Sequence, residues 1–188
     1  MNKRMDIRRI TYDALLAAMC AVLGYFSLSI GTSWKFTFEN IPVLIGALMF
    51  GPLDGALIGG VGTLIYQMVR FGLEISTPLW ILPYVISGLM VGFAAKKKRF
   101  RFKPWEIVVL MIVNGLVVTA VNTGSLYIYY KYILQIPLAT MLANIPIRVA
   151  ISVIKAVVCA VLIPLLIQGL EKARIYERPG KKTGKQAG

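Results

Sequence analysis

Long apolar segments alternate along the chain with short polar breaks. Six apolar segments stand out, and they run over Ile10–Ile30, Ile41–Phe50, Leu53–Phe71, Pro78–Ala95, Glu106–Tyr130 and Ile145–Leu170. Most of them approach the roughly 20 residues that a helix needs to cross the hydrocarbon core of a bilayer. The pattern therefore predicts an all-α integral membrane protein with six transmembrane helices.

The second apolar segment is unusually short. It spans ten residues and stops at Gly51-Pro52, a sequence typical of a helix end. Asn40 is a suitable N-cap for this helix, and Asp54 can cap the helix that follows. Ten helical residues reach about 15 Å, half of the hydrocarbon core. We therefore expect the start of this helix to lie below the membrane surface.

The residues before the short helix alternate between aromatic and polar types in the run WKFTFE. This alternation predicts an extended loop with Trp34, Phe36 and Phe38 on one face. Non-helical backbone at that depth must be covered by protein or line a cavity. We expect a loop that dips into a cavity from outside. The alternative is a helix that begins near Ser33, with the aromatic residues in an ordinary interfacial belt.

Charge is concentrated at a few places in a chain that is 57% hydrophobic and 15% charged, with a formal net charge of +13. Sixteen of the 21 Lys and Arg residues lie in three blocks, namely Lys3–Arg9, Lys96–Lys103 and Lys172–Lys185. Each block adjoins an apolar segment, as positive-inside topology signals do. This placement indicates a protein surrounded by membrane lipid and argues against a nucleic-acid partner.

The number of spans decides where these blocks lie. Six spans place all three blocks and both termini in the cytoplasm, as the positive-inside rule requires. Five spans, with Ile41–Phe71 as one helix, would place the Lys96 block outside. We therefore expect a six-helix membrane domain over residues 1–170, followed by a basic, disordered cytoplasmic tail over residues 171–188.

The composition offers little for catalysis. The chain has no histidine, which removes the commonest general base and the commonest metal ligand. Its two cysteines, Cys20 and Cys159, lie in separate apolar segments and are interpreted as packing residues. We expect no catalytic residues, no metal and no cofactor, and hence a protein that is not an enzyme.

Polar side chains recur at helical spacing in the last three apolar segments. The fourth segment carries Trp80, Tyr84 and Ser87 on one face, the fifth carries Asn114, Asn122 and Ser125 with Thr119 and Thr123 beside them, and the sixth carries Arg148, Ser152, Lys155 and Cys159. Lys155 lies about 10 Å below Arg148 along one helix face. A cation inside a membrane usually pairs or lines a pathway.

The sequence is compatible with two partners that would neutralise the charge of Lys155. Glu39 can reach it if the loop dips, and otherwise a bound anion supplies the countercharge. The two cations, Arg148 and Lys155, favour a ligand that carries a carboxylate. The aromatic residues offer stacking, and the amides offer paired donors and acceptors for a polar ring.

Small residues mark one face of the first segment, at Ala14, Ala17, Ala18 and Ala21. Alanines four residues apart let another helix approach closely. Their spacing is compatible with packing inside this protein and with docking of a partner helix.

The run FENIPVLIGALMFGPLDGALIGGVG, together with the six spans and the alanine-rich first helix, resembles the substrate-binding (S) components of energy-coupling-factor (ECF) vitamin transporters. Within that family the runs TPLWILPYVISGLMVG and NTGSLYIYYKY are most similar to the folate group. The resemblance covers about residues 8–170.

The resemblance implies a vitamin-binding protein of a prokaryotic plasma membrane, with a pocket in the outer halves of the helices. It also implies two kinds of partner, a coupling transmembrane protein that contacts the alanine face and two cytoplasmic ATPases. The alternatives are another vitamin such as pantothenate, or an unrelated small membrane enzyme or channel-like protein. The expected substrate-binding residues are Trp34, Lys35, Glu39, Asn40, Trp80, Tyr84, Asn114, Asn122, Arg148 and Lys155.

Overall fold

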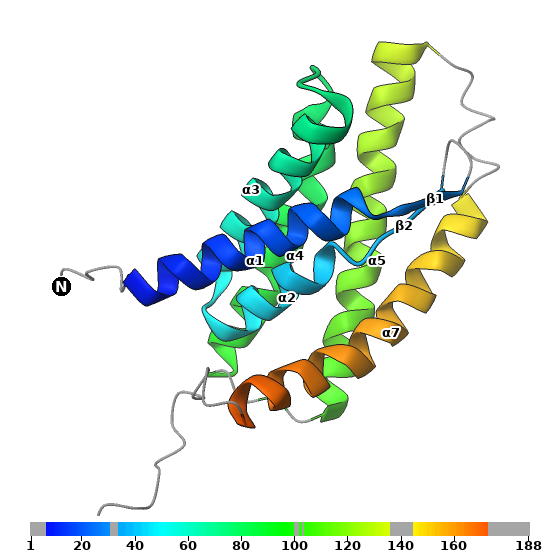
Figure 1. The fold of residues 1–188 in the computed structure, drawn as a ribbon. Coiled ribbons are helices and arrows are strands. Elements are labelled where there is room, and N and C mark those ends of the chain that lie inside the picture. The colour runs from blue at the N-terminus through cyan, green and yellow to red at the C-terminus, as the bar shows by residue number, and fades with distance from the viewer. Residues whose placement is uncertain (1–6, 31–33, 100–101, 103, 136–144, 173–188) are drawn as a thin grey trace, which may run out of the picture.

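The computed structural model describes residues 7–30, 34–99, 102, 104–135 and 145–172. These residues form a bundle of six α-helices (Figure 1). The helices are α1 (Ile7–Tyr25), α2 (Asn40–Met49), α3 (Pro52–Phe71), α4 (Thr77–Lys97), α5 (Pro104–Ile128) and α7 (Ile145–Lys172). A π-helical turn, η1 (Tyr129–Leu134), continues α5, and two short strands, β1 (Leu28–Ile30) and β2 (Trp34–Phe36), follow α1.

Three stretches of helix in the described part of the chain are long and apolar enough to cross a membrane by length and composition: Thr77–Lys97, Trp105–Ile133 and Arg148–Ile167. Helix α2 is apolar but shorter. Large apolar side chains such as Leu57, Val61 and Val157 are exposed on the outside of the bundle, which suits contact with lipid. The predicted all-α membrane fold with six helices is confirmed, with the β1–β2 hairpin as an addition.

The first helix ends earlier than the sequence predicted. Helix α1 stops at Tyr25, whereas the predicted span continued to Ile30, and β1 instead pairs antiparallel with β2. Arg70 of α3 donates from Nη1 to the Tyr25 carbonyl oxygen at 3.0 Å and to Ser27 Oγ at 3.0 Å. These bonds satisfy a carbonyl at the helix end and hold the chain where it leaves α1.

The loop before α2 is extended, as the alternating pattern predicted. Helix α2 begins at Asn40, so the alternative start near Ser33 is wrong. The backbone enters α2 through a tight turn in which the Glu39 amide donates to Thr37 Oγ1 at 3.1 Å. Strand β2 therefore leads directly into the start of a buried helix.

The break between α2 and α3 confirms two helices rather than the single helix of the five-span alternative. Gly51 has a φ of 115°, a backbone conformation that favours glycine, and Pro52 starts α3. The two predicted side-chain caps are wrong, because neither helix start has a side-chain cap hydrogen bond. Asp54 binds Arg9 instead, and Asn40 contacts Ser87.

Arg9 ties the start of α1 to the α2–α3 turn. Its Nε donates to Asp54 Oδ1 at 2.9 Å, its Nη2 donates to the Phe50 carbonyl oxygen at 2.9 Å, and Nη2 also pairs with Asp54 Oδ2. We call this end of the bundle, which also carries Lys96–Arg99, the basic end. The opposite end, which carries β1 and β2, is the hairpin end (Figure 1).

Helices α3 and α4 approach each other backbone to backbone, and α3 also packs on α1. A Cβ added at Gly88 of α4 would lie 2.3 Å from the carbonyl carbon of Gly55 in α3. A Cβ added at Gly92 would lie 2.3 Å from the Cα of Pro52. Only glycine permits these contacts, which is how small residues support helix association in lipid.

The apolar core fills the half of the bundle nearer the basic end. It joins side chains of α2, α4, α5 and α7, which pack around the centre of that half. They are Leu44, Ala47, Leu48, Val91, Ala95, Ile107, Met111, Ala160, Ile163 and Ile167.

Candidate ligand-binding site

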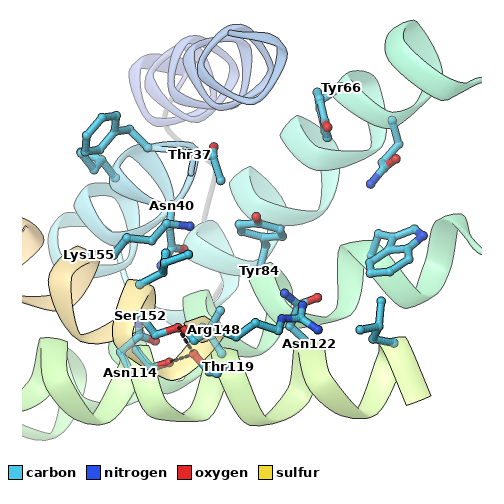
Figure 2. Close-up of a pocket in the computed structure, with 18 of the residues that line it drawn as sticks. Thr37, Asn40, Tyr66, Tyr84, Asn114, Thr119, Asn122, Arg148, Ser152 and Lys155 are labelled. Carbon is cyan, nitrogen blue, oxygen red and sulfur yellow. Dashed lines mark hydrogen bonds between the residues drawn. The ribbon is translucent and has the colours of Figure 1, made fainter. Parts of the chain in front are cut away.

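A cavity of about 480 Å³ occupies the half of the bundle nearer the hairpin end. Its wall is formed by the residues that lead into α2, together with parts of α3, α4, α5, η1 and α7 (Figure 2). Pockets that hold vitamin-sized ligands measure about 300 to 1,000 Å³. The cavity is therefore large enough for a small-molecule ligand.

Aromatic side chains from α4 and η1 cover one side of the cavity. Trp80 and Tyr84 of α4 line it, and so do Tyr129 and Tyr130 of η1. The Trp80 and Tyr129 rings meet edge to face with centroids 5.5 Å apart, and the Tyr129 and Tyr130 rings lie 6.1 Å apart. Such surfaces suit stacking of a planar ring.

Three asparagine side chains contribute amide groups to the wall: Asn40 at the start of α2, and Asn114 and Asn122 on α5. Asn114 is only 2% exposed. Ser87 of α4 donates from Oγ to Asn114 Oδ1 at 2.9 Å and lies 3.2 Å from Asn40 Oδ1. Two of the three amides, those of Asn40 and Asn114, are thus held in place from behind by a buried hydroxyl.

Helix α7 brings two cations into the cavity wall, Arg148 and Lys155. In Figure 2 the Arg148 side chain points towards Asn122, and the Lys155 side chain points towards Asn40. Arg148 Nη1 is buried and has no hydrogen-bond partner among the described residues. A buried guanidinium donor is costly to leave unpaired, so an acceptor on a ligand would stabilise it.

A pair of hydroxyls joins α5 and α7 beside Arg148. Thr119 Oγ1 and Ser152 Oγ lie within hydrogen-bond distance of each other, and each also lies within hydrogen-bond distance of the carbonyl oxygen four residues before it, so two protons are shared among three contacts. Those carbonyl groups belong to Gly115, at 2.7 Å, and Arg148, at 2.8 Å. The pair fixes the spacing of the two helices where the guanidinium enters the cavity.

The cavity brings together most of the sequence-predicted site residues. The predicted residues that line it are Asn40, Trp80, Tyr84, Asn114, Asn122, Arg148 and Lys155.

Glu39 is placed differently from these residues. It is 0% exposed and lies outside the cavity wall. Its Oε2 would be 2.6 Å from a Cβ added at Gly24, beside the Tyr66 ring. Trp34 and Lys35 lie on β2, and their side chains are outside the part of the chain that the structure describes.

Several lining residues were not predicted from the sequence. They include Thr37, Tyr66, Gln67, Glu74, Tyr129 and Tyr130. Thr119 and Ser152 also line the cavity, and both belong to the polar faces that helical spacing predicted. Tyr129 was accessible to the same reasoning, because the helical spacing from Asn114 through Asn122 continues to it. Tyr66 and Gln67 belong to α3, where polar residues also recur at helical spacing through Thr63, Tyr66, Gln67 and Arg70, so the same reasoning could have found them.

The fold buries two of the four alanines on the predicted face of α1 and leaves the other two exposed. Ala17 and Ala21 are 6% and 9% exposed, and a Cβ added at Gly62 of α3 would lie 2.8 Å from the Ala17 carbonyl oxygen. Both alanines are therefore used for packing inside this chain. Ala14 and Ala18 are exposed on the outside of the bundle.

The floor of the cavity merges with the apolar core. Leu44 and Met111 line the cavity and also belong to the core cluster at the basic end. Apolar side chains therefore separate the cavity from the basic end. This arrangement suits a binding pocket more than a continuous polar pore.

The sequence profile of the ECF transporter, substrate-specific component, matches residues 8–176. The match covers most of the chain, and the chain belongs to this family of membrane transport proteins. A comparison with curated proteins finds no significant match.

Solved structures share the fold at low sequence identity. A crystal structure of the S-component for biotin from an ECF-type ABC transporter matches with a TM-score of 0.65 and 18% identity, covering 89% of this chain and 95% of that one. A structure of the S component of a bacterial ECF transporter matches with a TM-score of 0.63 and 20% identity, covering 89% and 97%. These likenesses confirm the S-component fold.

Proposed function

We propose that this chain captures a vitamin for an ATP-driven ECF importer in a prokaryotic plasma membrane, and that the vitamin is folate. The observation that carries the proposal is one cavity that combines aromatic faces, three amides and two cations. Folate has a pterin ring, a second aromatic ring and two carboxylates, so it can use all three kinds of group.

Other vitamins would engage fewer of the aromatic, amide and cationic groups that line the cavity. Pantothenate is an anion, which suits Arg148 and Lys155, but it has no aromatic ring for Trp80 and Tyr129. Biotin, named for one of the structural neighbours, has a single carboxylate and no aromatic ring. Riboflavin is aromatic but lacks a carboxylate.

The positive-inside rule orients the protein in this proposal. The basic end, with Arg9 and Lys96–Arg99, faces the cytoplasm together with both termini. The cavity at the hairpin end then faces outside, where a vitamin is captured.

Transport requires energy from other chains in this proposal. A coupling transmembrane protein and two cytoplasmic ATPases are the partners that the resemblance to ECF vitamin transporters implies. Ala14 and Ala18 supply small, exposed positions on α1 at which a partner helix can approach closely.

Calorimetry of the purified chain in detergent tests the substrate. The ligands are folate, 5-formyl-tetrahydrofolate, pantothenate, biotin, riboflavin and thiamine, each without any partner protein. The proposal expects saturable binding of a folate at one site and at least tenfold weaker binding of the others. Preferential binding of another vitamin would keep the transporter class and refute folate.

A further inference from the structure

Ser87 lies where α2, α4 and α5 meet. Its side chain is 0% exposed and is not part of the cavity wall. Its Oγ lies 3.2 Å from Asn40 Oδ1 and 2.9 Å from Asn114 Oδ1, and both asparagines line the cavity. One buried hydroxyl therefore contacts two of the amides that face a ligand.

A proton count shows that these contacts are not equivalent. A serine hydroxyl has one proton and two lone pairs, so it donates to one carbonyl oxygen at a time. A second carbonyl oxygen would then face a lone pair, which is repulsive. A half-turn of one amide exchanges its oxygen and nitrogen at the same place and satisfies all three groups.

The burial of the two amides indicates which one turns. Asn114 is 2% exposed and makes the shorter contact, so its oxygen keeps the hydroxyl proton. Asn40 is only partly buried and makes the longer contact. Lys155 lines the same cavity as Asn40, and an ammonium group donates but cannot accept, which favours the Asn40 oxygen on the cavity side.

We propose that Ser87 is a positioning residue that sets ligand specificity through a hydrogen-bond relay. In this relay Asn40 Nδ2 donates to Ser87 Oγ, and Ser87 Oγ donates to Asn114 Oδ1. Each amide then turns its other end to the cavity. The wall offers one acceptor, Asn40 Oδ1, and one donor, Asn114 Nδ2, in a fixed order.

The relay defines the ligand chemistry that the wall accepts. It fits a ring edge with a donor N–H next to an acceptor C=O, as in the lactam edge of a pterin. The inference thus deepens the proposed function and rests on it. Aminopterin, the 4-amino analogue of folate, has an amino donor and a ring-nitrogen acceptor at those two places. Its edge presents the same groups in reversed order.

The test compares the affinities of folate and aminopterin for the unmodified protein and for Ser87→Ala. The unmodified protein should prefer folate by about tenfold or more, since each mismatched hydrogen bond costs on that order. Ser87→Ala frees both amides to turn and should bring the ratio close to one. Ser87→Thr keeps a hydroxyl and should restore the preference.

Ser125→Ala is the matched control, because Ser125 is a buried serine of α5, 3% exposed, outside the cavity wall. It should leave the ratio of the two affinities unchanged. A merely structural role for Ser87 would weaken both ligands equally in Ser87→Ala, and an unchanged ratio there would overturn the proposal.

A measurement without ligand separates the relay from the choice of substrate. If neither pteridine binds the unmodified protein, folate is refuted, while the relay is still tested by hydrogen exchange. With ¹⁵N-labelled asparagine, the side-chain amide protons of Asn40 should exchange with water faster in Ser87→Ala than in the unmodified protein, because their acceptor is lost, while those of Asn114 should change little. Faster exchange at Asn114 alone, or no change at Asn40, would overturn the relay.

Discussion

Arg148 and Lys155 place two positive charges about two helical turns apart on α7, in the wall of a cavity inside the bundle. Charged side chains within a membrane are costly, and those that persist usually serve a pathway or a ligand. The Nη1 atom of Arg148 is buried and has no hydrogen-bond partner in the described part of the chain, which also supports a role in binding a ligand. An anionic ligand would supply an acceptor for this guanidinium.

Replacing either cation tests this reading at the residue scale. Lys155→Met and Arg148→Met keep an apolar stem of similar shape and remove the charge, so each should weaken folate binding by about 10- to 100-fold. Calorimetry with the purified variants measures the change.

Lys131→Met is the matched control for charge. Lys131 is exposed on η1, where its Nζ lies 3.4 Å from Tyr127 Oη, and it does not line the cavity. Its replacement should leave affinity unchanged. Equal weakening in all three variants would mean that net charge, rather than a ligand contact, explains the effect.

Side-chain placement was predictable where helical spacing alone decides it. Trp80 and Tyr84 are four residues apart on one helix, and both line the cavity. Glu39 follows no such rule, because its direction depends on the room beside Gly24 of α1. Tyr66 shares a face of α3 with Thr63 and Gln67, so helical spacing could have indicated it as well.

At the scale of elements, the α3–α4 contact depends on Gly88. An added Cβ would lie 2.3 Å from the Gly55 carbonyl carbon, and backbone on that side cannot move as a flexible side chain would. Gly88→Ala should therefore destabilise the protein by about 1 to 3 kcal/mol, although alanine favours helix. Thermal unfolding in detergent measures the loss.

Gly124→Ala provides the comparison for this substitution. Gly124 lies within α5, and an added Cβ there meets no atom within 4 Å. The same change should leave the unfolding temperature unchanged or raise it slightly. A Gly88→Ala protein as stable as Gly124→Ala would contradict the tight backbone contact.

Helix ends were predictable where a local signal exists. The Gly51-Pro52 pair marked the break between α2 and α3, and Gly51 has the positive φ that such a break requires. The end of α1 was not predictable in this way. It is held by Arg70, which lies 45 residues after the Tyr25 carbonyl group that it binds.

At the scale of the whole molecule, the bundle has an apolar core in the half nearer the basic end and a cavity in the half nearer the hairpin end. Six apolar segments and three basic blocks predicted the order of the helices and the end at which the charges gather. They could not predict that Leu44 and Met111 close the cavity floor, because that depends on how four helices meet.

The outward face of α1 is where the proposed coupling protein would dock. Ala14→Trp or Ala18→Trp should abolish uptake by the assembled transporter and leave ligand binding by the isolated chain intact, because both positions are exposed. Vitamin uptake into cells and calorimetry measure the two effects separately.

Ala120→Trp controls for bulk on a lipid-facing surface, since Ala120 is exposed on α5. It should preserve both uptake and binding. Loss of binding in the α1 variants would show that this face serves packing inside the chain instead of a partner.

The most direct test of the central claim, that the vitamin binds in the cavity, uses the tryptophans. The chain has three, Trp34, Trp80 and Trp105, and among the side chains described Trp80 lines the cavity while Trp105 is exposed at the basic end. In a protein that retains only Trp80, with the other two changed to Phe, folate should quench fluorescence in a saturable way. A protein that retains only Trp105 should show no saturable quenching. Folate binding detected by calorimetry without quenching of Trp80 would contradict the account.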